Sequence, residues 1–200
     1  MYKNTFVKGF SQRFSPVTQH IVPHLDFRTP IVYNQVSPTH KRCKMKKIMF
    51  VCHGNICRSP MAEFIFKDIL NKRNLTHQFH IASAATSTEE IWNGVGNPVY
   101  PPAKAELAKH GISCEGKRAV QVTKADYDAY DYLICMDSAN LRNLARIVGA
   151  DRDNKISLLL DYTDRKGASI ADPWYTRDFT ATYRDIVDGL NGFMKYIGME

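Results

Sequence analysis

Hydrophobic and polar positions alternate in a regular way only from Met45 onward. Upstream of it, short apolar pairs show no sustained period, and prolines interrupt the segment every seven or eight residues, which leaves no room for a helix of useful length. We therefore expect residues 1–44 to be a flexible extension and residues 45–200 to form one folded domain.

Five short apolar runs in the domain are typical of strands. The run at 47–52 is apolar at every position after its lysine, which is the pattern of a strand buried on both faces of a sheet. The other runs lie at 79–84, 118–122, 131–136 and 155–160.

Apolar residues at helical spacing separate these runs. Ser59 is the expected N-cap of the first helix, with Pro60 at its first position. A turn-rich stretch at 97–102 leads into a short helix that closes at Gly111, and a helical turn follows 118–122. Ser138 is the expected N-cap of the helix that ends near Gly149.

An apolar stripe from Phe179 to Ile197 predicts one more, longer helix at the end of the domain. Strands that alternate with helices at this spacing predict an α/β fold, with a parallel sheet covered by helices on both faces. Ligands of such folds bind at the carboxyl ends of the strands.

Charge is concentrated outside the predicted domain. Residues 1–44 hold seven lysines and arginines against Asp26 alone, whereas residues 45–200 hold 20 basic and 19 acidic side chains. The domain shows no basic stripe with interleaved aromatics, so we expect no nucleic-acid partner. Residues 1–44 stay open to three interpretations: a flexible tail, an organelle transit peptide, or a segment upstream of a natural start at Met45.

The five cysteines, Cys43, Cys52, Cys57, Cys114 and Cys135, are odd in number and scattered. With no apolar run long enough for a signal peptide or a membrane span, they favour reduced thiols in the cytoplasm and no membrane insertion. Their spacing does not match a zinc site.

The stretch VCHGNICRSP carries the chemistry, because it places Cys52 at a strand end and Arg58 just before a helix. Backbone N–H groups of a loop that enters a helix form a cradle for an oxyanion, and the helix dipole adds partial positive charge. We expect Gly54 to adopt backbone angles that a side chain would forbid. The cradle and the arginine favour the thiolate, so the pKa of Cys52 is expected below its ordinary value.

A thiolate beneath a bound tetrahedral anion is a nucleophile aimed at phosphorus. Arg58 can hold two equatorial oxygens of that anion in a bidentate grip, which a lysine cannot reproduce.

The same stretch resembles the phosphate loop of low-molecular-weight protein tyrosine phosphatases. Further matches follow the loop through residues 47–198: Ser83 after a strand, AKHGI at 108–112, AVQVT at 119–123, CMDSANL at 135–141 and DPWY at 172–175. The resemblance implies a flavodoxin-like, four-stranded parallel sheet with helices on both faces. It also implies a monomer without metal or cofactor.

The resemblance further implies hydrolysis of phosphotyrosine in a protein substrate through a cysteinyl-phosphate. Cys52 would be the nucleophile, Arg58 the phosphate clamp, and Asp172 the acid of the first step and the base of the second. The implied phosphate-binding segment comprises His53, Gly54, Asn55, Ile56, Cys57, Arg58 and Ser59.

Other implied roles concern residues around this loop. Asn55, Ser83 and His110 would brace it, and Asp137 would orient Arg58. Ser59 would ease breakdown of the phosphoenzyme, and Cys57 would form a reversible disulfide with the nucleophile. The implied pocket walls are His53, Trp92, Trp174 and Tyr175.

Taken without the resemblance, several of these residues have ordinary structural explanations. Asp172-Pro173 reads as a turn, His110 as a solvent-facing residue at a helix end, and Cys57 as a small loop filler. Half of the aromatic residues would pack against the core. His53 and Trp174 also depart from the leucine and tyrosine common in animal members, so substrate preference is not transferred.

Three other functions use the same features. An arsenate reductase needs two more thiols, and Arg142 stands where the relay cysteine is expected. A protein-arginine phosphatase tends to have threonine at the position of Ile56, and isoleucine favours phosphotyrosine. A phosphoprotein-binding module without catalysis would not need Cys52, Arg58 and Asp172 together.

Overall fold

The computed structural model describes residues 45–199 of the 200-residue chain. The predictions made for residues 1–44 lie outside the described residues. The strands are β1 (Lys46–Cys52), β2 (Phe79–Ala85), β3 (Ile91–Trp92), β4 (Val95–Gly96), β5 (Tyr132–Cys135) and β6 (Ile156–Leu158). The α-helices are α1 (Arg58–Lys72), α2 (Pro101–Lys109), α3 (Lys124–Ala129), α4 (Ser138–Val148), α5 (Pro173–Thr176) and α6 (Phe179–Tyr196). Short 3-10 turns lie at Thr76–Gln78 and Leu159–Tyr162.

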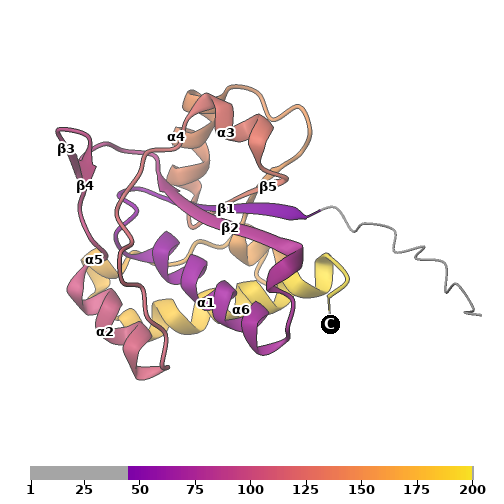
Figure 1. Ribbon diagram of the computed structural model, residues 1–200. Coiled ribbons are helices and arrows are strands. Elements are labelled where there is room, and N and C mark those ends of the chain that lie inside the picture. The colour runs from indigo at the N-terminus through magenta and orange to yellow at the C-terminus, as the bar shows by residue number, and fades with distance from the viewer. Residues whose placement is uncertain (1–44, 200) are drawn as a thin grey trace, which may run out of the picture. The chain divides into compact units, whose positions relative to one another are not determined.

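Four strands form a parallel sheet in the order β2-β1-β5-β6, which confirms the predicted α/β fold with a four-stranded parallel sheet (Figure 1). Strand β1 lies between β2 and β5, with Cys52 opposite Ala85 and Val51 opposite Cys135. The strand ends that carry chemistry therefore meet at one edge of the sheet. The hairpin of β3 and β4 is a separate, two-stranded sheet.

Alternating residues of β1 divide the core into two parts. Ile48 and Phe50 point into a cluster with α1, α2 and α6, whereas Met49 and Val51 point into a second cluster with α3 and α4. All four side chains are buried. This two-sided burial is why the run reads as continuously apolar in the sequence.

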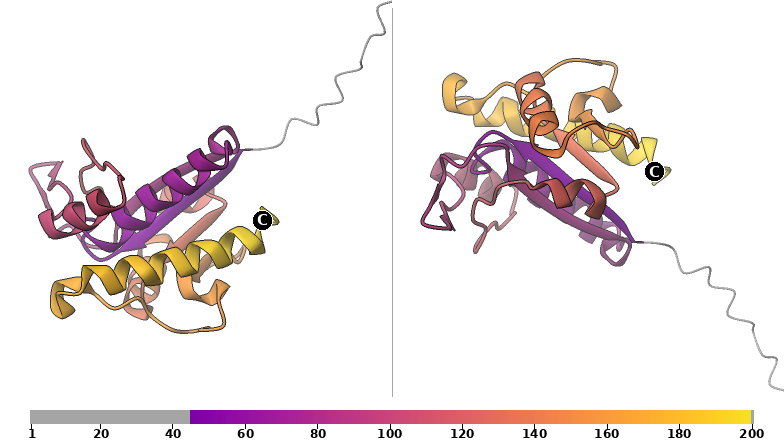
Figure 2. Two further views of the ribbon diagram at one scale, coloured as in Figure 1. Left: turned by 90° about the horizontal axis from the view of Figure 1, so that it is seen from below. Right: turned by 90° about the horizontal axis from the view of Figure 1, so that it is seen from above.

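Helices α1 and α6 lie side by side across one face of the sheet, and α3 and α4 cover the other face (Figure 2). Phe66 of α1 contacts Phe50, Phe79 and Phe193 in edge-on ring pairs. These contacts pack α1 against β1, β2 and α6. No helix in residues 45–199 is long and apolar enough to span a membrane.

Two local predictions outside the loop after β1 are wrong. Residues 118–122 do not form a strand: the segment makes one parallel bridge, between Gln121 and Ala85 at the end of β2, and the backbone N–H of Val120 donates to the Asn55 side chain. Ser138 is not an N-cap, because the Asp137 carboxylate takes that position and accepts from the N–H of Asn140 at 2.7 Å. A carboxylate accepts this bond as well as a hydroxyl does.

Candidate active site

The loop after β1 turns sharply around a buried sulfur. Asn55 adopts the left-handed conformation with φ 57°, which an asparagine tolerates, and its backbone N–H points at Cys52 Sγ at 3.3 Å. Gly54 has no such backbone angle, so the prediction of a forbidden conformation there is wrong. A Cβ at Gly54 would lie 3.0 Å from Cγ of Glu90, so a side chain there would require the Glu90 side chain to shift by a few tenths of an ångström.

Helix α1 begins at Arg58, two residues earlier than the capping pattern predicts, with Cys57 at the N-cap position. Ser59 therefore lies inside the helix, and its predicted N-cap role is wrong. Its hydroxyl contacts Cys52 Sγ at 3.0 Å and accepts from Asn55 Nδ2 at 2.8 Å. The hydroxyl is thus held against the sulfur by the loop itself.

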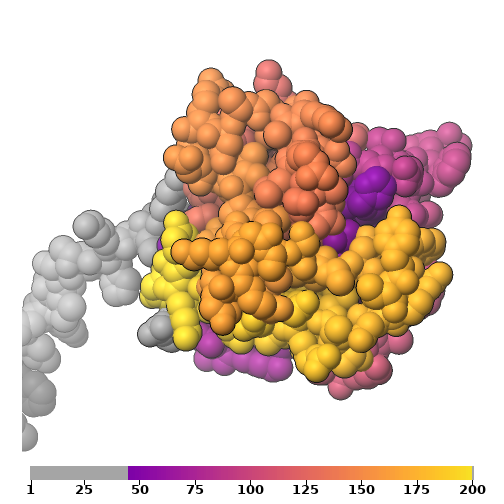
Figure 3. Space-filling view, turned by 180° about the vertical axis from the view of Figure 1, so that it is seen from behind, coloured from indigo at the N-terminus to yellow at the C-terminus, as the bar shows by residue number. Residues whose placement is uncertain are grey.

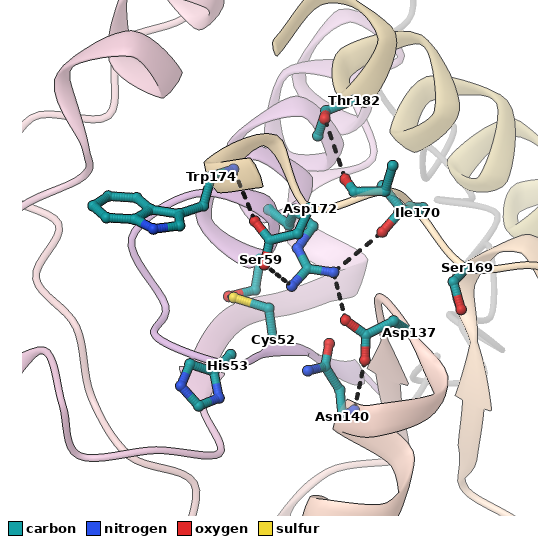
Figure 4. Close-up of polar contacts among 12 residues, drawn as sticks. Cys52, His53, Ser59, Asp137, Asn140, Ser169, Ile170, Asp172, Trp174 and Thr182 are labelled. Carbon is teal, nitrogen blue, oxygen red and sulfur yellow. Dashed lines mark hydrogen bonds and ion pairs between the residues drawn. The ribbon is translucent and has the colours of Figure 1, made fainter. Parts of the chain in front are cut away.

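Two carboxylates and a carbonyl hold the Arg58 guanidinium, which is 3% exposed. Nη1 donates to Asp137 Oδ2 at 2.6 Å and to the Ile170 carbonyl at 3.1 Å, and Nη2 donates to Asp172 Oδ2 at 2.5 Å (Figure 4). Burial alone would lower the pKa of Arg58, but the charges of Cys52, Asp172 and Asp137 raise it above its ordinary value. The side chain is therefore a fixed cation beside the loop.

Both carboxylates are themselves fixed at helix starts. Asp137 is the N-cap of α4, and Asp172 is the N-cap of α5, where it accepts from the N–H of Trp174 at 3.0 Å. Because each carboxylate uses one oxygen for its helix and the other for Arg58, the ends of β5 and of the loop before α5 converge on one point. The sequence prediction that Asp137 pairs with Arg58 agrees with this contact.

A buried polar network supports the loop from behind. Asn55 Nδ2 donates to Ser83 Oγ at 2.8 Å, and Ser83 Oγ donates to Glu63 Oε2 at 2.6 Å. Lys117 Nζ lies 3.0 Å from Glu63 Oε2 and donates to the Ser83 carbonyl at 2.9 Å. We call Asn55, Ser59, Ser83, Glu63 and Lys117 the brace.

Charge in the brace is balanced. Burial alone would raise the pKa of Glu63, but Lys117, Lys67 and the Ser83 hydroxyl lower it below its ordinary value. Glu63 is 4% exposed, so its carboxylate depends on these partners.

His110 is not part of this network, which corrects the predicted bracing role. Its ring stacks on Tyr183 with the centroids 3.7 Å apart, and Nε2 lies 3.7 Å from Glu106. It occupies the end of α2, which is the ordinary structural explanation that the sequence had left open. Lys117 contacts Ser83 instead.

A cavity of about 210 Å³ opens above the sulfur. It is lined by Cys52, His53, Gly54, Ile56, Cys57, Arg58, Glu89, Glu90, Asp172, Trp174 and Tyr175. Trp92 does not line it, so the predicted pocket wall is wrong at that residue, which is 71% exposed on β3. In Figure 3 a small indigo patch from the first part of the described chain reaches the surface where orange, yellow and magenta segments meet.

The neighbouring thiols differ from Cys52 in their surroundings. Burial, and the charges of Cys52 and Asp172, raise the pKa of Cys57 to about 12, so it is a neutral thiol near pH 7. Burial likewise raises the pKa of Cys135, which is fully buried and does not line the cavity. Cys52 and Cys57 are both free thiols here, and a disulfide between them stays a prediction.

Sequence reasoning missed four side chains at this site: Glu63, Lys117, Glu89 and Glu90. A signal existed for Glu63, an acid that interrupts an apolar helix face four residues after Ser59. Lys117 and the two other glutamates lie in loops, where spacing does not predict direction. The Ile170 carbonyl is a backbone group and leaves no trace in the sequence.

Known proteins are similar to most of this chain in sequence and in fold. The family model of low molecular weight phosphotyrosine protein phosphatases matches residues 47–200. The phosphatase of that name from Gallus gallus is 40% identical over 156 residues, covering 76% of this chain and 96% of the relative.

Solved structures agree with the sequence comparison. The crystal structure of YfkJ from Bacillus subtilis has a TM-score of 0.72 at 36% identity, covering 78% of this chain and 96% of that one. The structure of DARP, a drosophila arginine phosphatase, has a TM-score of 0.66 at 29% identity, covering 77% and 98%. With the loop, the paired aspartates and the sheet described above, these matches show that the chain belongs to the low molecular weight phosphotyrosine protein phosphatase family.

Proposed function

We propose that this protein hydrolyses phosphotyrosine in protein substrates through a cysteinyl-phosphate. The observation that carries the proposal is the Cys52 sulfur, which accepts from the Asn55 N–H at 3.3 Å and lies 3.0 Å from the Ser59 hydroxyl, a group that can donate to a thiolate. Hydrogen-bond donors aimed at a sulfur favour the thiolate. The fixed Arg58 cation lies beside it, where a phosphate dianion needs a bidentate partner.

The first step transfers the phosphoryl group to sulfur. The Cys52 thiolate attacks phosphorus, the bond from phosphorus to the phenolic oxygen breaks, and the Asp172 carboxyl donates its proton to that oxygen. A phosphate bound to Arg58 takes the Nη2 donor that Asp172 now holds at 2.5 Å. Substrate binding thus frees the Asp172 carboxyl group, which lines the cavity, to face the leaving oxygen.

The second step returns the enzyme to its starting state. The Asp172 carboxylate removes a proton from water as the water oxygen attacks phosphorus, and the bond from sulfur to phosphorus breaks. The electron pair returns to the sulfur, where the Ser59 hydroxyl and the Asn55 N–H stabilise the thiolate. Inorganic phosphate leaves, and no metal or redox partner enters the balance.

An aryl leaving group fits the walls of the cavity. Ile56, Trp174 and Tyr175 offer apolar surface above the sulfur, and the Trp174 ring is held against Tyr100 with the centroids 5.1 Å apart. Aromatic rings bind well between such surfaces. This is the support for phosphotyrosine over phosphoserine, whose short side chain would not reach the walls while its phosphate lies in the loop.

The experiment compares matched peptides that carry phosphotyrosine, phosphoarginine or phosphoserine under reducing conditions. We expect turnover to be fastest on phosphotyrosine and to vanish on every peptide in Cys52→Ser, which still binds vanadate or phosphate. Appreciable turnover by Cys52→Ser would refute the covalent mechanism. Fastest turnover on phosphoarginine would support the second candidate below.

Protein-arginine phosphatase is the second candidate, because two carboxylates, Glu89 and Glu90, line the cavity and could face a guanidinium. The structural relative DARP is named as such an enzyme. The branched Ile56 at the cavity favours the aryl substrate. Arsenate reduction has less support, since Cys135 is fully buried and Arg142 occupies the position expected for a relay thiol.

A further inference from the structure

The mouth of the cavity has two chemically different sides. One side is formed by His53 and by Glu89 and Glu90 of the loop after β2. The other side is formed by Trp174 and Tyr175 of α5. Figure 4 shows Trp174 above and His53 below the Cys52 sulfur. We call these five residues the rim. A substrate that reaches the sulfur passes between a carboxylate side and an aromatic side.

The carboxylate side is held in place and open to solvent. Glu89 is 72% exposed, and its Oε2 lies 2.9 Å from Nε2 of His53. Glu90 accepts from Asn97 Nδ2 at 2.7 Å, and its Cγ lies against the phosphate loop at Gly54. Each carboxylate therefore has a polar partner at the mouth of the cavity.

Cations are scarce among the described residues that line the cavity. Arg58 is the one lysine or arginine among them, and Asp137 and Asp172 already hold it. Arg177, on the aromatic side, lies over the Trp174 ring at 5.5 Å from its centroid. The charge facing a substrate from the Glu89 side is thus negative.

We propose that Glu89 and Glu90 select phosphotyrosyl segments that carry lysine or arginine beside the phosphotyrosine and disfavour acidic neighbours. This inference rests on the proposed phosphotyrosine activity. With the phosphate in the loop, the aryl ring spans the cavity and the neighbouring residues of the substrate lie at the rim. Opposite charges then meet across an exposed contact, and like charges repel.

The test measures kcat/KM on phosphotyrosyl peptides that differ only in the residues flanking the phosphotyrosine: lysine, glutamine or glutamate. We expect the order lysine, glutamine, glutamate, with steps of up to about five-fold for exposed ion pairs. The spread narrows as salt is added, because exposed charges are screened. In the double variant Glu89→Gln/Glu90→Gln the lysine-to-glutamate ratio falls toward one.

The readout is a ratio on one enzyme preparation, so any loss of folding or turnover common to all peptides cancels. Asp188→Asn, which removes an exposed carboxylate of α6 outside the cavity lining, is the matched control and keeps the wild-type ratio. Equal rates on all three peptides, or an unchanged ratio in the double variant, would overturn the inference. Absence of turnover on every phosphotyrosyl peptide would instead refute the proposed function on which it rests.

Discussion

The brace behind the phosphate loop and the rim in front of it are built in opposite ways. Asn55 and Ser83 are each 1% exposed, and every side-chain nitrogen and oxygen of the brace has a partner. In the rim, Glu89 is 72% and Tyr175 82% exposed. For the proposed function, the comparison assigns two tasks: the brace would fix the positions of the reacting atoms, and the rim would contact the substrate.

The physical reason is that substitutions in the brace cost more folding free energy than substitutions in the rim. A buried and fully satisfied network has one good arrangement, and removing any member leaves a partner unsatisfied. An exposed side chain can be exchanged at little cost to stability. Substitutions near Cys52 are therefore expected to alter the reaction or the fold, whereas substitutions in the rim alter preference.

Arg58→Lys tests the reacting centre itself. A lysine keeps the charge but offers one ammonium in place of a planar fork, so it cannot hold two phosphate oxygens while facing Asp137 and Asp172. We expect kcat on para-nitrophenyl phosphate to fall by about 10³-fold or more. Arg165→Lys, at an exposed pair with Asp185 and Asp188, is the control and leaves kcat unchanged. A loss below about ten-fold in Arg58→Lys would contradict the bidentate role.

Asp172→Asn separates proton donation from structure. Asparagine can still cap α5 through its Oδ1, but its amide group cannot accept from Arg58 Nη2, so we expect a lower melting temperature from the lost ion pair, an effect that is the same for every substrate. With phenyl phosphate, whose leaving group needs a proton, kcat is expected to fall by about 10²- to 10⁴-fold. With para-nitrophenyl phosphate the loss is smaller, because that phenolate leaves unaided. Equal losses on both substrates would argue against Asp172 as the acid.

Much of this fold could be predicted from the sequence, because the elements that form the sheet carry their own signals. The run at 47–52 is apolar on both faces, and the stripe from Phe179 to Ile197 has helical spacing, so both were predicted near their observed bounds. The pairing of Asp137 with Arg58 came from the family resemblance. Spacing alone could not supply it, since 79 residues separate the two.

The predictions that failed concern atoms whose partners come from elsewhere in the fold. Ser59 was expected to cap α1, yet tertiary contacts with Cys52 and Asn55 take its hydroxyl. His110 was expected in the brace, and Lys117 contacts Ser83 there instead. Residues 118–122 have a strand composition, but Asn55 takes one of their donors. A local sequence pattern predicts helices and strands, but it does not predict which residue from a distant part of the chain will contact a given polar group.

Lys117→Met breaks the brace without touching the loop. It leaves the Glu63 carboxylate buried with only Lys67 as a charged partner, and uncompensated buried charge costs about 3 kcal/mol or more of unfolding free energy at pH 7. Urea unfolding measures this loss. Lys67→Met, which removes the more exposed partner, is the matched control and costs less than about 1 kcal/mol. Equal losses of unfolding free energy in the two variants would contradict the argument that the buried partner Lys117 stabilises Glu63 more than the exposed partner Lys67 does.

The same network sets a pH dependence of stability. The folded protein holds the pKa of Glu63 below its ordinary value. On average Glu63 therefore binds fewer protons in the folded state than in the unfolded state. Its contribution is fully present above the ordinary pKa of about 4.3 and is lost as pH falls through the lower folded value. Wild type and Glu63→Gln are therefore expected to converge in unfolding free energy on acidification, and a constant difference from pH 7 to pH 3 would contradict the argument.

Tyr175→Ala probes the rim, where the expected effect is smallest. At 82% exposure the ring adds little to the folded state, so the melting temperature is expected to stay within about 1 °C of the wild type. An aryl substrate loses one stacking partner, which raises KM for phenyl phosphate by about two- to ten-fold with kcat nearly unchanged. Tyr175→Phe keeps the ring and restores KM. If Tyr175→Ala instead lowered the melting temperature as Lys117→Met does, rim and brace would be one cooperative unit, and selection of substrates could not change without disturbing the chemistry.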